Sequence, residues 1–74
     1  RGRRVVDFGC GNGSDVVALA LAGAERVVGV DILEPGLDVG RALALRHGVA
    51  DRCLFTTHWT EPVDVVVSID AFEH

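Results

Sequence analysis

The stretch VVDFGCGNGS, residues 5–14, decides the fold of this 74-residue chain. An apolar run is interrupted by an acidic residue here, and three glycines follow at alternate positions. Apolar runs of this kind are typical of a buried parallel strand, and glycines directly after a strand suit a turn whose backbone approaches a ligand closely. The apolar segment 15–22 then predicts a helix. A strand, a glycine loop and a helix N-terminus in this order predict a ligand site.

The spacing of the glycines narrows the choice of ligand. Nicotinamide and flavin folds use glycines at relative positions one, three and six, whereas Gly9, Gly11 and Gly13 occupy positions one, three and five. Asp7 precedes the first glycine by two residues. Its carboxylate would repel a pyrophosphate on the same loop and attract an ammonium or sulfonium group.

The same ten residues resemble the first motif of class I S-adenosylmethionine-dependent methyltransferases. In that family the glycine loop carries the methionine end of the cofactor. The resemblance implies that S-adenosyl-L-methionine is bound by Asp7, Gly9, Cys10, Gly11 and Gly13. A glycine-rich turn that serves only as a tight connection is the structural alternative.

The order of elements predicts an α/β fold. Strands are expected at residues 4–8, 26–31, 52–57 and 63–69, and helices at residues 14–23 and 35–47. Alternating strands and helices imply a parallel sheet with right-handed crossovers. We therefore expect a Rossmann-like doubly wound sheet with strand order 3-2-1-4 and two helices, in which residues 1–74 form part of a methyltransferase cofactor-binding domain. At 74 residues the chain is about half the usual size of a domain and is interpreted as a fragment.

Several residues mark the ends and faces of the two helices. Ser14 is the expected N-cap of the first helix. Pro35 suits the first position of the second helix, and Gly48 suits the position after its end. The apolar positions of the second helix, expected to face the sheet, are Leu37, Ala44 and Leu45, with Arg41 and Arg46 toward solvent.

Asp31 is the second expected anchor of the ligand. It ends the second strand 22 positions after Gly9, close to the spacing at which Rossmann-type folds place an acid on a ribose. A carboxylate accepts hydrogen bonds from both ribose hydroxyls. The alternative is that Asp31 only caps a turn. By resemblance, Asp31 binds the ribose and Ile32 lies against the adenine.

The stretch VDVVVSIDAFEH, residues 63–74, resembles the fourth motif of the same family. Asp64 opens the strand, and Ser68 and Asp70 lie at its carboxyl end, the ligand side of a parallel sheet. The last residues are similar to methyltransferases of small molecules, which implies a small-molecule acceptor. Glu73 and His74 suit acid–base chemistry, but Asp70 and Glu73 better fit a capping box. No catalytic residue is assigned.

The connection at residues 57–62 departs from the family pattern. Thr57 and His58 fall near the position of the acid that usually meets the adenine amino group, and Trp59 suits either stacking on the base instead or packing under the loop. Six residues reach at most ~20 Å, barely enough to cross three strand spacings of ~4.8 Å. Either the third strand is frayed, or residues present in relatives are missing here.

The composition restricts the partners. The formal net charge is −4, and no basic cluster suggests a nucleic-acid footprint. Cys10 and Cys53 are far apart and predict neither a disulfide nor a metal site, and the histidines lack ligand spacing. We find no membrane segment and expect a cytoplasmic protein. The alternatives to a methyltransferase are an NAD(P)-dependent oxidoreductase and a non-catalytic remnant of the methyltransferase fold.

Overall fold

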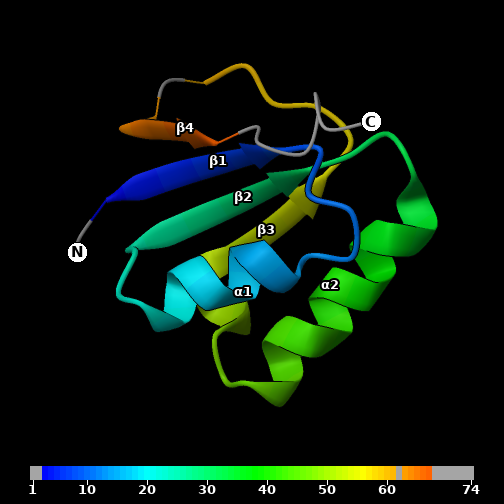
Figure 1. Cartoon of the computed structure of the whole chain (residues 1–74), viewed down its shortest axis with the longest axis horizontal. Helices are drawn as coiled ribbons and strands as arrows, with labels where there is room; N and C mark the ends of the chain where they lie inside the picture. Colours follow the sequence, from blue (N-terminus) through cyan, green and yellow to red (C-terminus); the bar gives the residue numbers. More distant parts are fainter. Residues whose placement is uncertain (1–2, 62, 68–74) are drawn as a thin grey trace.

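The structure is a computed structural model that describes residues 3–61 and 63–67. Its elements, in chain order, are β1 (Arg4–Phe8), α1 (Ser14–Leu21), β2 (Arg26–Val30), α2 (Glu34–Arg46), the 3-10 helix η1 (Ala50–Arg52), β3 (Cys53–Thr56) and β4 (Val65–Val67). The strands form one parallel sheet in the order β3-β2-β1-β4 (Figure 1). This arrangement confirms the predicted fold class and strand order. Within the described residues, no helix has the length and apolar character needed to cross a membrane.

Both helices cover the same face of the sheet (Figure 1). Successive side chains of a strand point to opposite faces, so Val5 and Val27 join the helices in the larger core, where α1 contributes Val16 and α2 contributes Leu37. The opposite face carries Val6, Val28 and Val30. The near-continuous apolar strands therefore serve two hydrophobic layers, as expected for a parallel sheet.

The connection from β3 to β4 crosses the sheet on the face away from the helices. Trp59 and Val63 pack there against the valines of β1 and β2, together with Phe8. β3 ends at Thr56 and β4 begins at Val65, so residues 57–64 are available instead of the predicted 57–62. The two strands are shorter than predicted at these ends, and the described residues of the longer connection, 57–61 and 63–64, contain no helix.

Asp64 joins the start of β4 to the start of β1. The backbone N–H of Arg4 donates to Asp64 Oδ2 at 2.9 Å, and the Asp64 N–H donates to the Arg4 carbonyl at 2.9 Å. Arg4 Nε also lies 3.6 Å from Asp64 Oδ2. The hydrogen bond from the Arg4 backbone is the main reason that the pKa of Asp64 is lowered. The acid that opens the fourth strand thus has a structural role.

Two expectations about the helices are wrong. Gly13, with φ 82°, holds the N-cap position of α1, and Ser14 is the first helical residue. Asn12, the residue before the cap, accepts the Ser14 N–H with its Oδ1 at 3.1 Å. Leu45 is 71% exposed, because α2 turns only its Leu37 and Ala44 stripe toward the sheet.

A glycine contact brings the two helices and β3 together. A Cβ atom added to Gly13 would lie 2.7 Å from Gly40 Cα and 2.7 Å from Cε1 of the buried Phe55 ring. Gly40 likewise faces the Phe55 ring with its bare Cα. The start of α1 therefore approaches α2 at a distance that only glycine permits.

We expect Gly13→Ala to lower the free energy of unfolding by about 2–4 kcal/mol, because it combines a strained positive φ with overpacking against Phe55. Gly48→Ala is the matched control: Gly48 has φ 74° but no described atom within 4 Å of an added Cβ. It should cost only the conformational part, about 1 kcal/mol. Urea unfolding of the intact protein measures both losses. Equal losses would show that the Gly13 contact is not close-packed.

Candidate cofactor site

The glycine loop is attached to the end of β2. The N–H groups of Gly9 and Cys10 both donate to the Val30 carbonyl, at 2.7 and 3.1 Å, and the Gly13 N–H donates to the Cys10 carbonyl at 3.0 Å. β1 and β2 are in parallel register with Phe8 opposite Val30, so the loop and Asp31 leave neighbouring strand ends side by side. The carboxyl ends of parallel strands are where ligands bind in such sheets.

All three glycines of the loop have left-handed backbone conformations. Their φ angles are 75° for Gly9, 58° for Gly11 and 82° for Gly13, a region in which glycine has no steric penalty. No described atom lies within 4 Å of a Cβ built on Gly9 or Gly11. The loop therefore presents open, bare backbone, which is the feature that a closely bound ligand requires.

Asp7 and Cys10 lie beneath this open surface. Asp7 is 4% exposed and Cys10 is 8% exposed. Burial, followed by the charges of Asp7 and Asp31, raises the pKa of the Cys10 thiol from 9.0 to about 11. The thiol is therefore protonated at neutral pH, and its packing, rather than nucleophilic chemistry, is its contribution to the loop.

Asp31 links the loop to the start of α2. Its Oδ2 accepts the Gly11 N–H at 2.9 Å, and its Oδ1 accepts the Leu33 N–H at 3.0 Å. Its own N–H donates to the Thr56 carbonyl at 3.1 Å, so β3 also helps to place it. The turn-capping role considered from the sequence is thus present, and the carboxylate in addition holds the glycine loop. Ile32 follows with 83% of its surface exposed, beside the open side of the site.

His58 and Trp59, the residues predicted to meet the adenine, differ in their burial. His58 is exposed. Trp59 is half-buried against the valines of the sheet face opposite the helices, and its Nε1–H donates to the Glu61 carbonyl at 2.9 Å. The packing alternative therefore describes the Trp59 ring in this structure, while its stacking on adenine stays a prediction. Ser68 and Asp70, like Glu73 and His74, lie outside the described residues.

Gly36 lies at the site and was not predicted from the sequence. A Cβ added to Gly36, in the first turn of α2, would lie 2.6 Å from the Gly11 carbonyl oxygen. The helix therefore supports the loop from below at a bare Cα. A glycine within a predicted helix was the available signal, but its partner is 25 positions away in the sequence, between Gly11 and Gly36.

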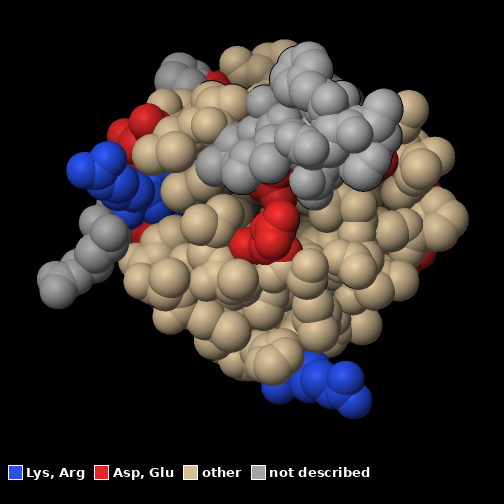
Figure 2. Space-filling model, in the orientation of Figure 1, with Lys and Arg blue, Asp and Glu red and all other residues tan. Residues whose placement is uncertain are grey.

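The charge around the site is negative. Acidic side chains lie near the start of α1, in the middle of the face that the helices form, while basic side chains lie at the margins of that face (Figure 2). Asp15, in the first turn of α1, belongs to the acidic side chains of this helix end. A negative potential favours a ligand that carries positive charge.

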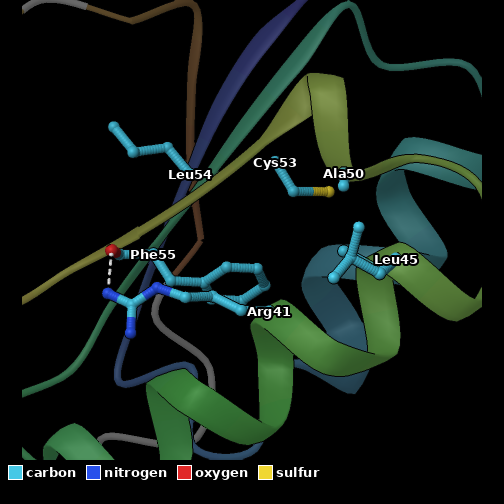
Figure 3. Close-up of a pocket in the computed structure, with 7 residues that line it drawn as sticks. Arg41, Leu45, Ala50, Cys53, Leu54 and Phe55 are labelled. Carbon is cyan, nitrogen blue, oxygen red and sulfur yellow. Dashed lines mark hydrogen bonds between the residues drawn. The ribbon is translucent and has the colours of Figure 1, made fainter.

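A separate groove of about 280 Å³ lies between α2 and the edge strand β3 (Figure 3). Arg41 borders it and is exposed, as predicted, and it also donates from Nη2 to the Phe55 carbonyl at 2.9 Å. None of the predicted cofactor residues lines this groove.

A parallel sheet in 3-2-1-4 order, a left-handed glycine loop after β1 and an acid after β2 fit Rossmann-like nucleotide-binding folds, among them the class of S-adenosylmethionine-dependent methyltransferases. A family model described as "Methyltransferase domain" matches residues 5–74, and the chain belongs to this family. The cofactor of the class is S-adenosyl-L-methionine. In agreement, the chain superposes with a TM-score of 0.83 on a SAM-dependent methyltransferase from Thiobacillus denitrificans solved with S-adenosyl-L-homocysteine; the identity is 26%, over 95% of this chain and 31% of that one.

Similar sequences are found among ribosomal protein L11 methyltransferases. The one from Azotobacter vinelandii is 44% identical over 72 residues, which cover 90% of this chain and 24% of the relative. The one from Photobacterium profundum is 35% identical over 68 residues, covering 92% and 23%. The ribosomal protein L11 methylase of Lactobacillus delbrueckii subsp. bulgaricus shares the fold, with a TM-score of 0.83 at 20% identity over 92% of this chain and 38% of that one. The chain spans about a quarter of the length of the curated relatives.

The expectation of a small-molecule acceptor is wrong. The relatives that match most of this chain at 35% identity or more are named for a protein acceptor, ribosomal protein L11. The expectation depended on the resemblance of the last residues, 70–74, which lie outside the described part of the chain.

We expect Cys10 to react slowly with thiol reagents. A pKa of about 11 instead of 9.0 leaves about a hundredfold less thiolate at pH 8. The rate with a disulfide reagent should be measured in a Cys53→Ser background, so that only Cys10 contributes. It should rise about tenfold for each pH unit between 8 and 10, because the raised pKa keeps the thiol protonated throughout this range. A rate that levels off near pH 9 would contradict the effect of burial and of the neighbouring carboxylates.

Proposed function

We propose that the protein binds S-adenosyl-L-methionine over the glycine loop after β1 and transfers its methyl group to a protein acceptor. The observation that carries this proposal is the open left-handed backbone of Gly9 and Gly11 beside the Asp31 carboxylate. Bare backbone next to an acid suits a ligand with a zwitterionic end and a ribose.

Each residue of the site has a role in this proposal. Gly9 and Gly11 allow the methionine part to approach the backbone, and the buried charge of Asp7 favours its positive end. Cys10 and Gly13 maintain the shape of the loop from below. Asp31 accepts hydrogen bonds from the ribose, since each carboxylate oxygen has a second lone pair beyond the one used by a backbone N–H.

The adenine end of the site is proposed from the sequence and from exposure. Ile32 offers an exposed apolar side chain next to Asp31. His58 and Trp59 follow β3, and Ser68 and Asp70 follow β4; their contacts with the cofactor rest on the motif resemblance. The bound cofactor supplies an electrophilic methyl group on sulfur. The residues of this chain contribute by holding it in one orientation, which lowers the entropic part of the barrier.

The proposed acceptor is a ribosomal protein of the L11 type. Support comes from the relatives named for this acceptor, of which one is 44% identical over 90% of the chain. Because the chain spans about a quarter of such relatives, the acceptor assignment concerns the intact protein. A cytoplasmic location belongs to the same proposal and agrees with the unpaired thiols of Cys10 and Cys53.

Cofactor binding is tested by calorimetric titration of the intact protein with S-adenosylhomocysteine and, separately, with NAD. We expect binding of the first ligand and no binding of the second. Gly11→Ala should weaken the first by at least about tenfold, because a methyl group at φ 58° would project into the open side of the loop. Gly48→Ala, beyond the C-terminal end of α2, should leave the affinity unchanged. Binding of NAD alone would support an oxidoreductase, and binding of neither ligand by the folded protein would support a non-catalytic remnant.

The acceptor is tested by transfer of a radiolabelled methyl group from S-adenosylmethionine to purified ribosomal protein L11. Label should appear in L11 with the intact wild-type protein and fall at least about tenfold with Gly11→Ala at limiting cofactor. Efficient cofactor binding without any labelling of L11 would sink the acceptor assignment and leave the cofactor assignment intact.

A further inference from the structure

The Asp31 carboxylate accepts hydrogen bonds from two segments of the chain, and binding a ribose does not require these two bonds. Its Oδ2 accepts the N–H of Gly11, at the centre of the glycine loop, and its Oδ1 accepts the N–H of Leu33, the N-cap residue of α2. Gly11 lies 20 positions before Asp31 in the sequence. The bond therefore joins the loop of β1 to the end of β2 through a side chain.

We propose that Asp31 is a positioning residue for the glycine loop as well as a ligand of the ribose. This inference rests on the proposed function. Asp31 would contact the ribose half of the cofactor. The affinity for the methionine half would nevertheless depend on Asp31, because Asp31 holds the loop that binds it. The two halves of the site are thereby coupled through one carboxylate.

The loop needs such an anchor at its centre. The N–H groups of Gly9, Cys10 and Gly13 are bonded to backbone carbonyls, which hold the two ends of the loop. The Gly11 N–H is held by the Asp31 side chain instead. Glycine has the largest conformational freedom of any residue, so this bond limits the shapes that the loop adopts before the ligand arrives. A loop already in its binding conformation gives higher affinity, because less ordering entropy is lost on binding.

The packing around Gly11 agrees with this role. The Gly11 carbonyl faces the bare Cα of Gly36 in the first turn of α2. The Leu33 N–H, bonded to the same carboxylate, belongs to the residue that starts that helix. The loop is therefore joined to the start of α2 twice, by the hydrogen bonds of Asp31 and by the close approach of Gly36.

Both oxygens remain able to accept a further hydrogen bond. An ionised carboxylate has about four acceptor positions, and the two backbone N–H groups use two of them. A ribose diol can occupy the others without releasing the loop. An asparagine cannot do the same, because its amide nitrogen is a donor and leaves one of the two N–H groups without an acceptor.

The test separates the two roles with a ligand that lacks the ribose hydroxyls. S-adenosylhomocysteine and its 2′,3′-dideoxy analogue are titrated into the intact wild-type protein, Asp31→Asn and Asp31→Glu. We expect Asp31→Asn to weaken the dideoxy analogue by about tenfold, since one uncharged oxygen is left for the two backbone N–H groups and the charge-assisted hold on the loop is lost, and Asp31→Glu to recover part of this loss. Asp51→Asn, an exposed carboxylate in η1, is the matched control and should change neither affinity. Unchanged affinity of Asp31→Asn for the analogue would overturn the positioning role and leave only the ribose contact.

A second measurement does not need a ligand. Amide hydrogen exchange, followed by NMR in the unliganded protein, should become at least about tenfold faster at Gly11 in Asp31→Ala, which removes both acceptor oxygens, whereas Gly13, bonded to the Cys10 carbonyl, should keep its rate. Unchanged exchange at Gly11 in the folded variant would overturn the proposal. If wild-type protein fails to bind S-adenosylhomocysteine, the proposed function fails, and the exchange rates still decide whether Asp31 holds the loop.

Discussion

The hydrogen bonds between the Val30 carbonyl and the N–H groups of Gly9 and Cys10 are the constraint on which the site depends. They turn the chain sharply at the end of β1 and attach the glycine loop to β2. The turn requires a positive φ at Gly9, which a side chain disfavours. Because the loop is attached to β2, the residue after that strand, Asp31, comes within hydrogen-bond distance of Gly11. The backbone geometry of one turn therefore sets the position of the loop and of the carboxylate together.

The helix layer maintains this arrangement through close approach. Gly13, Gly36 and Gly40 lack the Cβ atoms that would separate α2 from the loop and from the Phe55 ring. Phe55 comes from β3, which also accepts the Asp31 N–H at Thr56. Core packing and ligand site thus share residues, so a change in the core at these positions also moves the site. Close-packed protein interiors transmit such displacements.

Local pattern was sufficient for most of the fold. The strands of β1 and β2, the helix order and the 3-2-1-4 sheet were predicted correctly, because apolar runs, glycines and an acid at a fixed spacing are local signals. Three details were not. Ser14 is not the N-cap, since Gly13 holds that position. Leu45 is exposed, because helical spacing alone does not give the width of the buried stripe. The connection after β3 was predicted to be too short, because the predicted third strand continued past Thr56 and the predicted fourth strand began before Val65.

The sequence by itself determined the class of protein and of cofactor, because the residues that define them lie within short segments whose spacing is visible: residues 5–14 for the loop and Asp31 for the end of β2. It did not determine the acceptor, and the proposed acceptor rests on the names of similar proteins. Only the tertiary structure decided that Asp31 holds Gly11, that Gly36 supports the same peptide, and that Trp59 packs across the valine face. These contacts join residues about 20 or more positions apart. Such pairs meet only when the sheet and its helix layer have formed, since their distance depends on strand pairing and helix packing rather than on their separation along the chain.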